Sequence, residues 1–141
     1  MLLEKEYTEL ELGEVADMVL SKSEGTRLFL LHGEPGSGKT SLVAALCKRL
    51  GVQSEVNSPT FSLVNEYPLG GSTVYHLDLY RINKPEELME SGLSEHIDGS
   101  AYCFVEWPEI IGQIPIAKAI RIELEYRGSK RHLKMSRLQQ D

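Results

Sequence analysis

Residues 33–40 read GEPGSGKT, which places glycines, a lysine and a threonine in the order of a phosphate-binding loop. In the pattern G-x-x-x-x-G-K-[ST], backbone N–H groups line a nest the size of an anion, the lysine reaches the β- and γ-phosphates, and the last hydroxyl binds Mg²⁺. We therefore expect a nucleotide site with Mg²⁺ on Thr40. The residues expected to hold the nucleotide are Gly33, Gly36, Ser37, Gly38, Lys39, Thr40 and Ser41.

Two apolar stretches end in a carboxylate: VYHLD ends at Asp78 and YCFVE ends at Glu106. Hydrolysis of a nucleotide requires an acidic group on the metal and a group that orients water, in addition to the loop. A carboxylate at the end of a buried strand approaches Mg²⁺ directly or through water. For each acid taken alone, helix capping or an ion pair with Arg81 is an equally good interpretation.

Thr60 stands in NSPTF, residues 57–61, behind a rigid Ser-Pro pair. Several phosphate-binding-loop proteins keep a switch loop at this place in the chain, and its threonine senses the γ-phosphate and the metal. An ordinary Ser-Pro turn explains the same residues equally well on local sequence alone.

Trp107, the only tryptophan, directly follows Glu106, and Pro108 then fixes the exit of the chain. This position predicts an indole ring at the rim of the nucleotide site. The alternative is a ring packed in the core under the C-terminal strands. His76 shares a strand face with Asp78, and for it we favour a hydrogen-bonding role over metal ligation.

The hydrophobic spacing predicts an α/β fold, a phosphate-binding-loop mixed sheet flanked by helices. We expect parallel strands around the loop, and antiparallel ones in a hairpin after the loop helix and at the C-terminal edge. The expected elements are helices over 9–22 and 39–51, a short helix from Pro85 to near Gly92, strands over 26–32, 101–107 and 119–126, and a hairpin of strands 61–67 and 72–80 around a turn at 68–71.

The composition indicates one domain over residues 1–141, because 41% hydrophobic and 26% charged residues are ordinary values for a globular protein with one core. Apolar runs are too short for a membrane span, and the first ten residues are too charged for a signal peptide, so we expect a cytoplasmic protein that does not bind membranes. Cys47 and Cys103 lie in apolar surroundings, which favours two reduced, buried thiols.

The net charge of −6 is unevenly distributed, because residues 127–141 hold five Lys and Arg against Asp141 alone. This basic end can contact a nucleic acid or an acidic partner. No aromatic residue is interleaved with the charges, so we favour a solvated terminal strand with a frayed tail.

Four motifs in this order, GEPGSGKT, SPTF, VYHLDLYR and FVEWPE, resemble the TsaE proteins, small bacterial P-loop ATPases also called YjeE. The resemblance covers about residues 8–126. It implies ATP or ADP and Mg²⁺ as ligands and a role in making threonylcarbamoyladenosine in tRNA. It also implies the partners TsaD and TsaB, which transfer the threonylcarbamoyl group while the ATPase supports turnover, so that tRNA is contacted only indirectly or weakly.

The resemblance also assigns roles to individual residues. Lys39 and Thr40 hold phosphate and Mg²⁺, Glu106 is the acid beside the metal, Asp78 is a catalytic or switch acid, and Thr60 lies in a loop like switch I. The pair Glu34-Pro35 departs from the family, whose members more often have a small or aliphatic residue after the acid. Proline supplies no N–H, but it stands early in the loop, so we expect binding to survive.

Three other activities are compatible with a phosphate-binding loop. A GTPase is disfavoured, because NKPE at 83–86 imitates the guanine-reading N-K-x-D but lacks the aspartate and precedes the FVEW strand. A small-molecule kinase needs a lid with several arginines, and only Arg81 lies in the central region. A non-catalytic ATP-sensing or assembly module stays open.

Overall fold

A mixed β-sheet runs through the part of the chain that this computed structural model describes, residues 1–59, 63–90, 92–113 and 118–139. In these residues the strand order is β1-β7-β6-β2-β5-β4-β3. The strands β6, β2, β5 and β4 are parallel, and β1, β7 and β3 pair antiparallel with their neighbours. The bounds are β1 (Leu3–Tyr7), β2 (Leu28–His32), β3 (Val64–Leu69), β4 (Ser72–Asp78), β5 (Cys103–Glu106), β6 (Lys118–Arg127) and β7 (Lys130–Gln139). The predicted α/β fold with a mixed sheet is confirmed.

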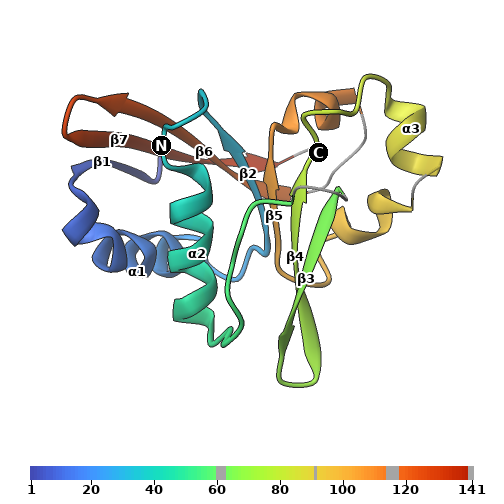
Figure 1. Ribbon diagram of the computed structural model, residues 1–141, viewed down its shortest axis with the longest axis horizontal. Helices are drawn as coiled ribbons and strands as arrows, with labels where there is room; N and C mark the ends of the chain where they lie inside the picture. The colour runs from blue at the N-terminus through green and yellow to red at the C-terminus, as the bar shows by residue number, and fades with distance from the viewer. Residues whose placement is uncertain (60–62, 91, 114–117, 140–141) are drawn as a thin grey trace.

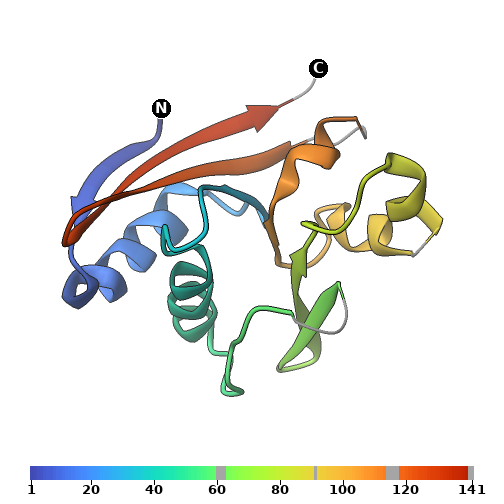
Figure 2. The same ribbon diagram turned by 45° about the horizontal axis from the view of Figure 1, so that its top comes forward.

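Helices cover both faces of this sheet (Figures 1 and 2). One face carries η1 (Glu9–Glu11), α1 (Leu12–Lys22) and α2 (Lys39–Leu50), and the other carries α3 (Pro85–Glu90), η2 (Leu93–Ile97) and η3 (Pro108–Gln113). The central strand β2 shows the division, because Phe29 and Leu31 pack with α1 and α2 while Leu28 and Leu30 pack with α3 and η2. A parallel strand buried on both faces reads as a continuous apolar run, as LFLLH does.

The loop helix α2 begins and ends at glycines in the left-handed region, Gly38 at φ 101° and Gly51 at φ 108°. The N–H of Gly51 donates to the carbonyls of Cys47 and Lys48 and closes the last turn. The predicted helix over 9–22 is present as well, with a first turn of 3₁₀ type. There, Thr8 N–H donates to Glu11 Oε1 at 3.0 Å.

The hairpin after α2 is present, but its predicted turn at 68–71 was too long. Strand β3 continues to Leu69, and the turn is the pair Gly70-Gly71. Pro68 is tolerated inside β3 because β3 is an edge strand, where the missing N–H faces away from the sheet. Strand β4 ends at Asp78 and not at residue 80, and β3 begins at Val64, while residues 60–62 lie outside the described residues.

The N-terminal strand β1 was not predicted, and its presence changes the place of the basic C-terminal segment. Strand β7 lies between β6 and β1, so it is an inner strand and not the solvated terminal strand that the composition favoured. The pairing runs from Leu3 opposite Met135 to Tyr7 opposite Arg131. His132 Nε2 also lies 2.7 Å from Glu4 Oε2. A partner strand more than 120 residues away leaves no local signal in the sequence.

No helix in the described part of the chain is long and apolar enough to cross a membrane. Cys47 and Cys103 are free and buried, as predicted. Burial raises the pKa of Cys47 to about 12 and raises the pKa of Cys103 strongly as well.

We expect neither thiol to react with Ellman's reagent at pH 8 in the folded protein, because the thiolate is the reactive form and burial disfavours it. Both thiols should react once guanidinium unfolds the chain. Absorbance at 412 nm measures this directly. Rapid labelling of one thiol, with circular dichroism unchanged, would contradict the tight packing of these side chains.

Candidate nucleotide site

The phosphate-binding loop lies where the order of the parallel strands reverses. It joins β2 to α2, and β2 has β6 on one side and β5 on the other. After α2 the chain reaches β4, returns to β5 beside β2, and then crosses to β6 on the other side. Ligands of open α/β sheets bind at the carboxyl ends of the strands at such a switch point.

Two positions of the loop favour glycine, for different reasons. A Cβ on Gly33 would lie 2.5 Å from Ser37 Oγ and 2.7 Å from the Leu124 carbonyl. A Cβ on Gly38 would lie 2.5 Å from Arg131 Nε, and φ of Gly38 is positive as well. A side chain at Gly33 would push the loop away from the β6 backbone, whereas at Gly38 the Arg131 side chain would have to move aside and the positive φ is what favours glycine.

Lys39 folds back over its own loop. Lys39 is only 5% exposed, and its Nζ donates to the Gly33 carbonyl at 2.6 Å. Nζ also lies 3.9 Å from the centre of the Trp107 ring, within the range of a cation–π contact. Burial lowers the pKa of Lys39, and the charges of Glu106 and Asp78 oppose that shift. The Lys39 ammonium group thus lies at the loop, in a position to bind an anionic phosphate.

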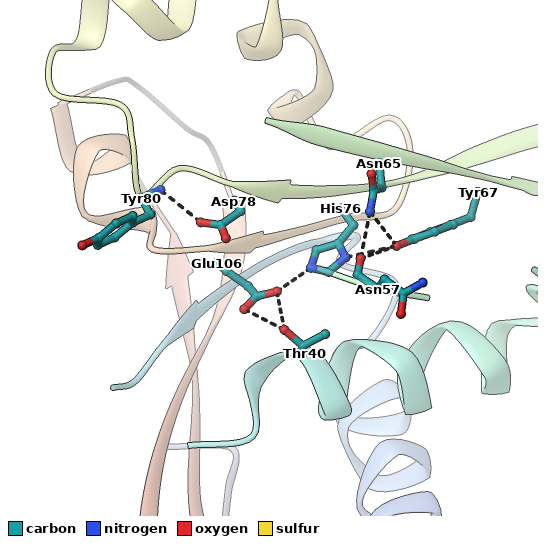
Figure 3. A network of polar contacts seen from close by, with 8 residues as sticks. All are labelled: Thr40, Asn57, Asn65, Tyr67, His76, Asp78, Tyr80 and Glu106. Carbon is teal, nitrogen blue, oxygen red and sulfur yellow. Dashed lines mark hydrogen bonds and ion pairs between the residues drawn. The ribbon is translucent and has the colours of Figure 1, made fainter. Parts of the chain in front are cut away.

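Glu106, at the end of β5, contacts the first turn of α2 (Figure 3). Thr40 Oγ1 donates to the carboxylate and lies 3.2 Å from Oε1 and 3.1 Å from Oε2. His76 Nε2 lies 2.5 Å from Oε2. Asp78 is paired directly with Glu106 in the parallel register of β4 and β5, and its Oδ1 accepts the Tyr80 N–H at 3.1 Å.

These donor atoms fit a magnesium ion that is shared with a nucleotide. Among the described residues, no group of three or more His, Cys, Asp or Glu side chains is placed to hold a metal alone. Mg²⁺ usually binds one or two protein oxygens and completes its shell with phosphate oxygens and water. The Thr40 hydroxyl and the Glu106 carboxylate supply oxygens of that kind beside the loop.

A cavity of about 590 Å³ opens over these groups, a volume in the range of small-molecule sites. It is lined by Glu34, Pro35, Gly36, Gly38, Lys39, Thr40, Ser41, Ser58, Asp78, Tyr80, Glu106, Trp107 and Arg131.

Most of the residues predicted for the site share this cavity. Gly33 and Ser37 belong to the loop but do not line the cavity, and Ser37 is buried. Thr60, predicted in the switch-like loop, lies outside the described residues.

Trp107 lines the cavity, and its ring lies beside Lys39. Its backbone is in the left-handed region, with φ 57°, which is uncommon for a bulky residue. The Tyr80 ring lies 5.0 Å from the indole, between ring centres. Strained backbone of this kind concentrates at ligand sites and is held by its surroundings.

Arg131 is a cavity residue that the sequence analysis did not identify. It reaches the cavity from β7, packs against Gly38, and holds its guanidinium 5.5 Å over the Tyr126 ring. A signal was present in the alternation of β7, because Leu133 and Met135 are buried on the α1–α2 face and Arg131 shares that face. The basic C-terminal segment therefore brings positive charge to this cavity, whereas the sequence analysis considered only a nucleic acid or an acidic partner for it.

Comparison with the sequences of known proteins identifies the family. The family described as threonylcarbamoyl adenosine biosynthesis protein TsaE matches residues 6–134. The chain belongs to the TsaE family. The tRNA threonylcarbamoyladenosine biosynthesis protein TsaE of Haemophilus influenzae is 34% identical over 133 residues, 92% of this chain and 84% of the relative. The protein of the same name from Bacillus subtilis is 31% identical over 114 residues, 81% of this chain and 71% of the relative.

A solved structure shows the same fold as this TsaE family member. The crystal structure of YdiB from Bacillus subtilis superposes with a TM-score of 0.71, covering 96% of this chain and 86% of that one at 24% identity. The predicted family resemblance is thus confirmed by sequence, and the fold by structure.

We expect Arg131→Gln to weaken ATP binding about tenfold, because hydrogen bonds to charged groups contribute roughly 1.5–3 kcal/mol. Calorimetry measures the affinity. Arg127→Gln is the matched control, since it removes the same charge from the same pair of strands and Arg127 pairs with exposed Glu125. Equal losses in the two variants would mean that Arg131 acts only through long-range charge.

Proposed function

We propose that residues 1–141 act as one ATPase domain that binds Mg·ATP at the cavity and supports tRNA threonylcarbamoyladenosine biosynthesis. The contact of Glu106 with Thr40 is the observation that carries this proposal. It joins an acid at a strand end to the hydroxyl of a phosphate-binding loop, the pairing that holds Mg²⁺ in P-loop NTPases. The names of the relatives supply the pathway.

In this proposal the loop binds phosphate before any chemistry occurs. Backbone N–H groups of Gly36, Gly38 and Ser41 and the Lys39 amine surround the phosphates, and Thr40 and Glu106 hold the metal. When bound, Mg²⁺ neutralises charge on the phosphate oxygens. Because a hydroxyl has one proton and two lone pairs, Thr40 donates to Glu106 and keeps lone pairs for the metal.

Asp78 is the candidate for orienting the attacking water. It lines the cavity next to Glu106, and its Oδ1 is fixed by the Tyr80 N–H. The Trp107 ring lies against the Lys39 amine. Thr60 stays in the proposal as the residue that senses the γ-phosphate, on the strength of its motif alone.

We propose TsaD and TsaB as partners and the cytoplasm as the location, with tRNA reached through the partners. Among the described lining residues, Arg131 is the one arginine, which disfavours a small-molecule kinase with its arginine-bearing lid. Asn83 and Lys84, which imitate a guanine-reading motif, are not among those lining residues, which disfavours a GTPase. An ATP-sensing module without hydrolysis is the second candidate.

Phosphate release from ATP tests the proposal. We expect slow release by the isolated chain and clear stimulation when TsaD and TsaB are added. Lys39→Ala is the control, because it removes the charge that contacts phosphate and should abolish the stimulated rate. Binding of ATP without phosphate release in either condition would favour the sensing module.

Glu106→Gln tests the metal side of the site. We expect saturating Mg·ATP to change the fluorescence of Trp107, since the indole lies on Lys39 and next to Glu106. The substitution should reduce the Mg²⁺-dependent part of this change and slow hydrolysis, while nucleotide binding without metal largely persists. A variant that hydrolyses ATP at the wild-type rate with its partners present would remove Glu106 from the catalytic assignment.

A further inference from the structure

A buried histidine stands behind the proposed metal site. His76, in the middle of the β3–β4 hairpin, is fully buried, and both of its ring nitrogens have partners. Nε2 lies 2.5 Å from Glu106 Oε2, and Nδ1 lies 3.3 Å from the Tyr67 hydroxyl (Figure 3). The roles proposed above for phosphate and metal make no use of this side chain.

The polar contacts continue beyond the ring. Asn65 Nδ2 donates to the Asn57 carbonyl at 2.8 Å and lies 3.4 Å from the Tyr67 hydroxyl, which is itself 3.0 Å from that carbonyl. Asn57 belongs to the segment between α2 and β3. A line of contacts therefore leads from the first turn of α2, through the Glu106 carboxylate and the His76 ring, to the backbone at Asn57.

The two contacts of the Glu106 carboxylate differ in what they determine. The Thr40 hydroxyl is almost equally far from Oε1 and Oε2, at 3.2 and 3.1 Å, so it does not select one rotation of the carboxylate. His76 contacts Oε2 alone. Because a carboxylate oxygen accepts, Nε2 is the donor in this bond, and its direction fixes the rotation of the carboxylate plane.

The His76 ring is itself held in one orientation by its second nitrogen. A ring with one bonded nitrogen can still tilt or flip. Because Nε2 donates to Glu106, Nδ1 accepts, and the Tyr67 hydroxyl gives its single proton to Nδ1 while Asn65 Nδ2 supplies the donor for the Asn57 carbonyl. Residues behind a metal ligand act in this way, since they orient the ligand and tune its basicity.

We propose that His76 is a positioning residue that sets the Glu106 carboxylate for Mg²⁺ and that Tyr67 locks its ring. The inference rests on the proposed Mg·nucleotide site and adds two residues to it. It requires that loss of His76 lowers the affinity for the metal much more than the affinity for the nucleotide. The loop and Lys39 bind phosphate without this line of contacts.

Binding of Mn²⁺, a paramagnetic substitute for Mg²⁺, tests this without any turnover. Free Mn²⁺ is read by electron paramagnetic resonance in an equimolar mixture of protein and ADP, and ADP affinity in EDTA is measured by calorimetry. We expect His76→Leu to weaken Mn²⁺ binding by at least about tenfold. Its ADP affinity in EDTA should stay within about threefold of the wild type, because the loop and Lys39 bind phosphate without His76.

Two further substitutions separate positioning from packing. His76→Gln places an amide N–H near the position of Nε2, so it should recover most of the Mn²⁺ affinity. Tyr67→Phe removes only the hydrogen bond that holds the ring, and we expect a loss of about fivefold, the size of one neutral hydrogen bond. Tyr75→Phe is the matched control, because Tyr75 is in the same hairpin and stacks on His96, and it should bind Mn²⁺ as the wild type does.

The outcomes distinguish this inference from the proposed function. A wild-type complex that binds no Mn²⁺ overturns the metal site itself. A folded His76→Leu variant with wild-type Mn²⁺ affinity, or one whose ADP affinity in EDTA falls equally, overturns the positioning role alone. If His76→Leu does not fold, wild-type Mn²⁺ affinity in Tyr67→Phe overturns it. In a Glu106→Gln background, His76→Leu should change Mn²⁺ binding no further, and an independent loss there would also contradict the inference.

Discussion

The contact between Glu106 and Thr40 joins the sheet to the helix that follows the phosphate-binding loop. It exists because β2 and β5 are parallel neighbours: β2 leads into the loop, β5 ends in the carboxylate, and Leu31 is paired with Glu106 across the two strands. The register of the next pair then places Asp78 beside Glu106. A shift of one residue in either pair would turn the acid to the opposite face of the sheet and empty the site of its carboxylates.

The antiparallel part of the sheet supplies the opposite wall of the same cavity. Leu133 and Met135 on β7 are fully buried against α1 and α2, and each such side chain contributes about 1.5–3 kcal/mol when buried. That burial determines which face of β7 points inward. Arg131 lies two residues before Leu133 and so reaches Gly38 on the same face. The packing of Leu133 and Met135 in the core therefore also determines that Arg131 reaches the cavity.

The features that the sequence predicts well are those that short-range chemistry determines. GEPGSGKT specifies a loop between a strand and a helix by itself, and the apolar spacing of α1 and α2 specifies buried stripes. Strand β1 was missed because its charged alternation finds its partner strand in β7, far along the chain. Likewise, His76 was correctly expected to form hydrogen bonds, but its partner Glu106 is 30 residues away and becomes visible only when β4 and β5 pair.

Lys39 links the loop to the strained end of β5. The left-handed backbone of Trp107 costs of the order of 1–3 kcal/mol, and a cation over an indole offsets about 0.5–2 kcal/mol of that. The same amine bonds the Gly33 carbonyl, so it is shared between the first residue of the loop and the ring after Glu106. An ammonium group has three N–H donors, so a bound phosphate shares this amine with the Gly33 carbonyl and competes only with the ring for the position of the charge. Phosphate binding should therefore change the surroundings of Trp107, because the cation that offsets the strain there is drawn towards the phosphate.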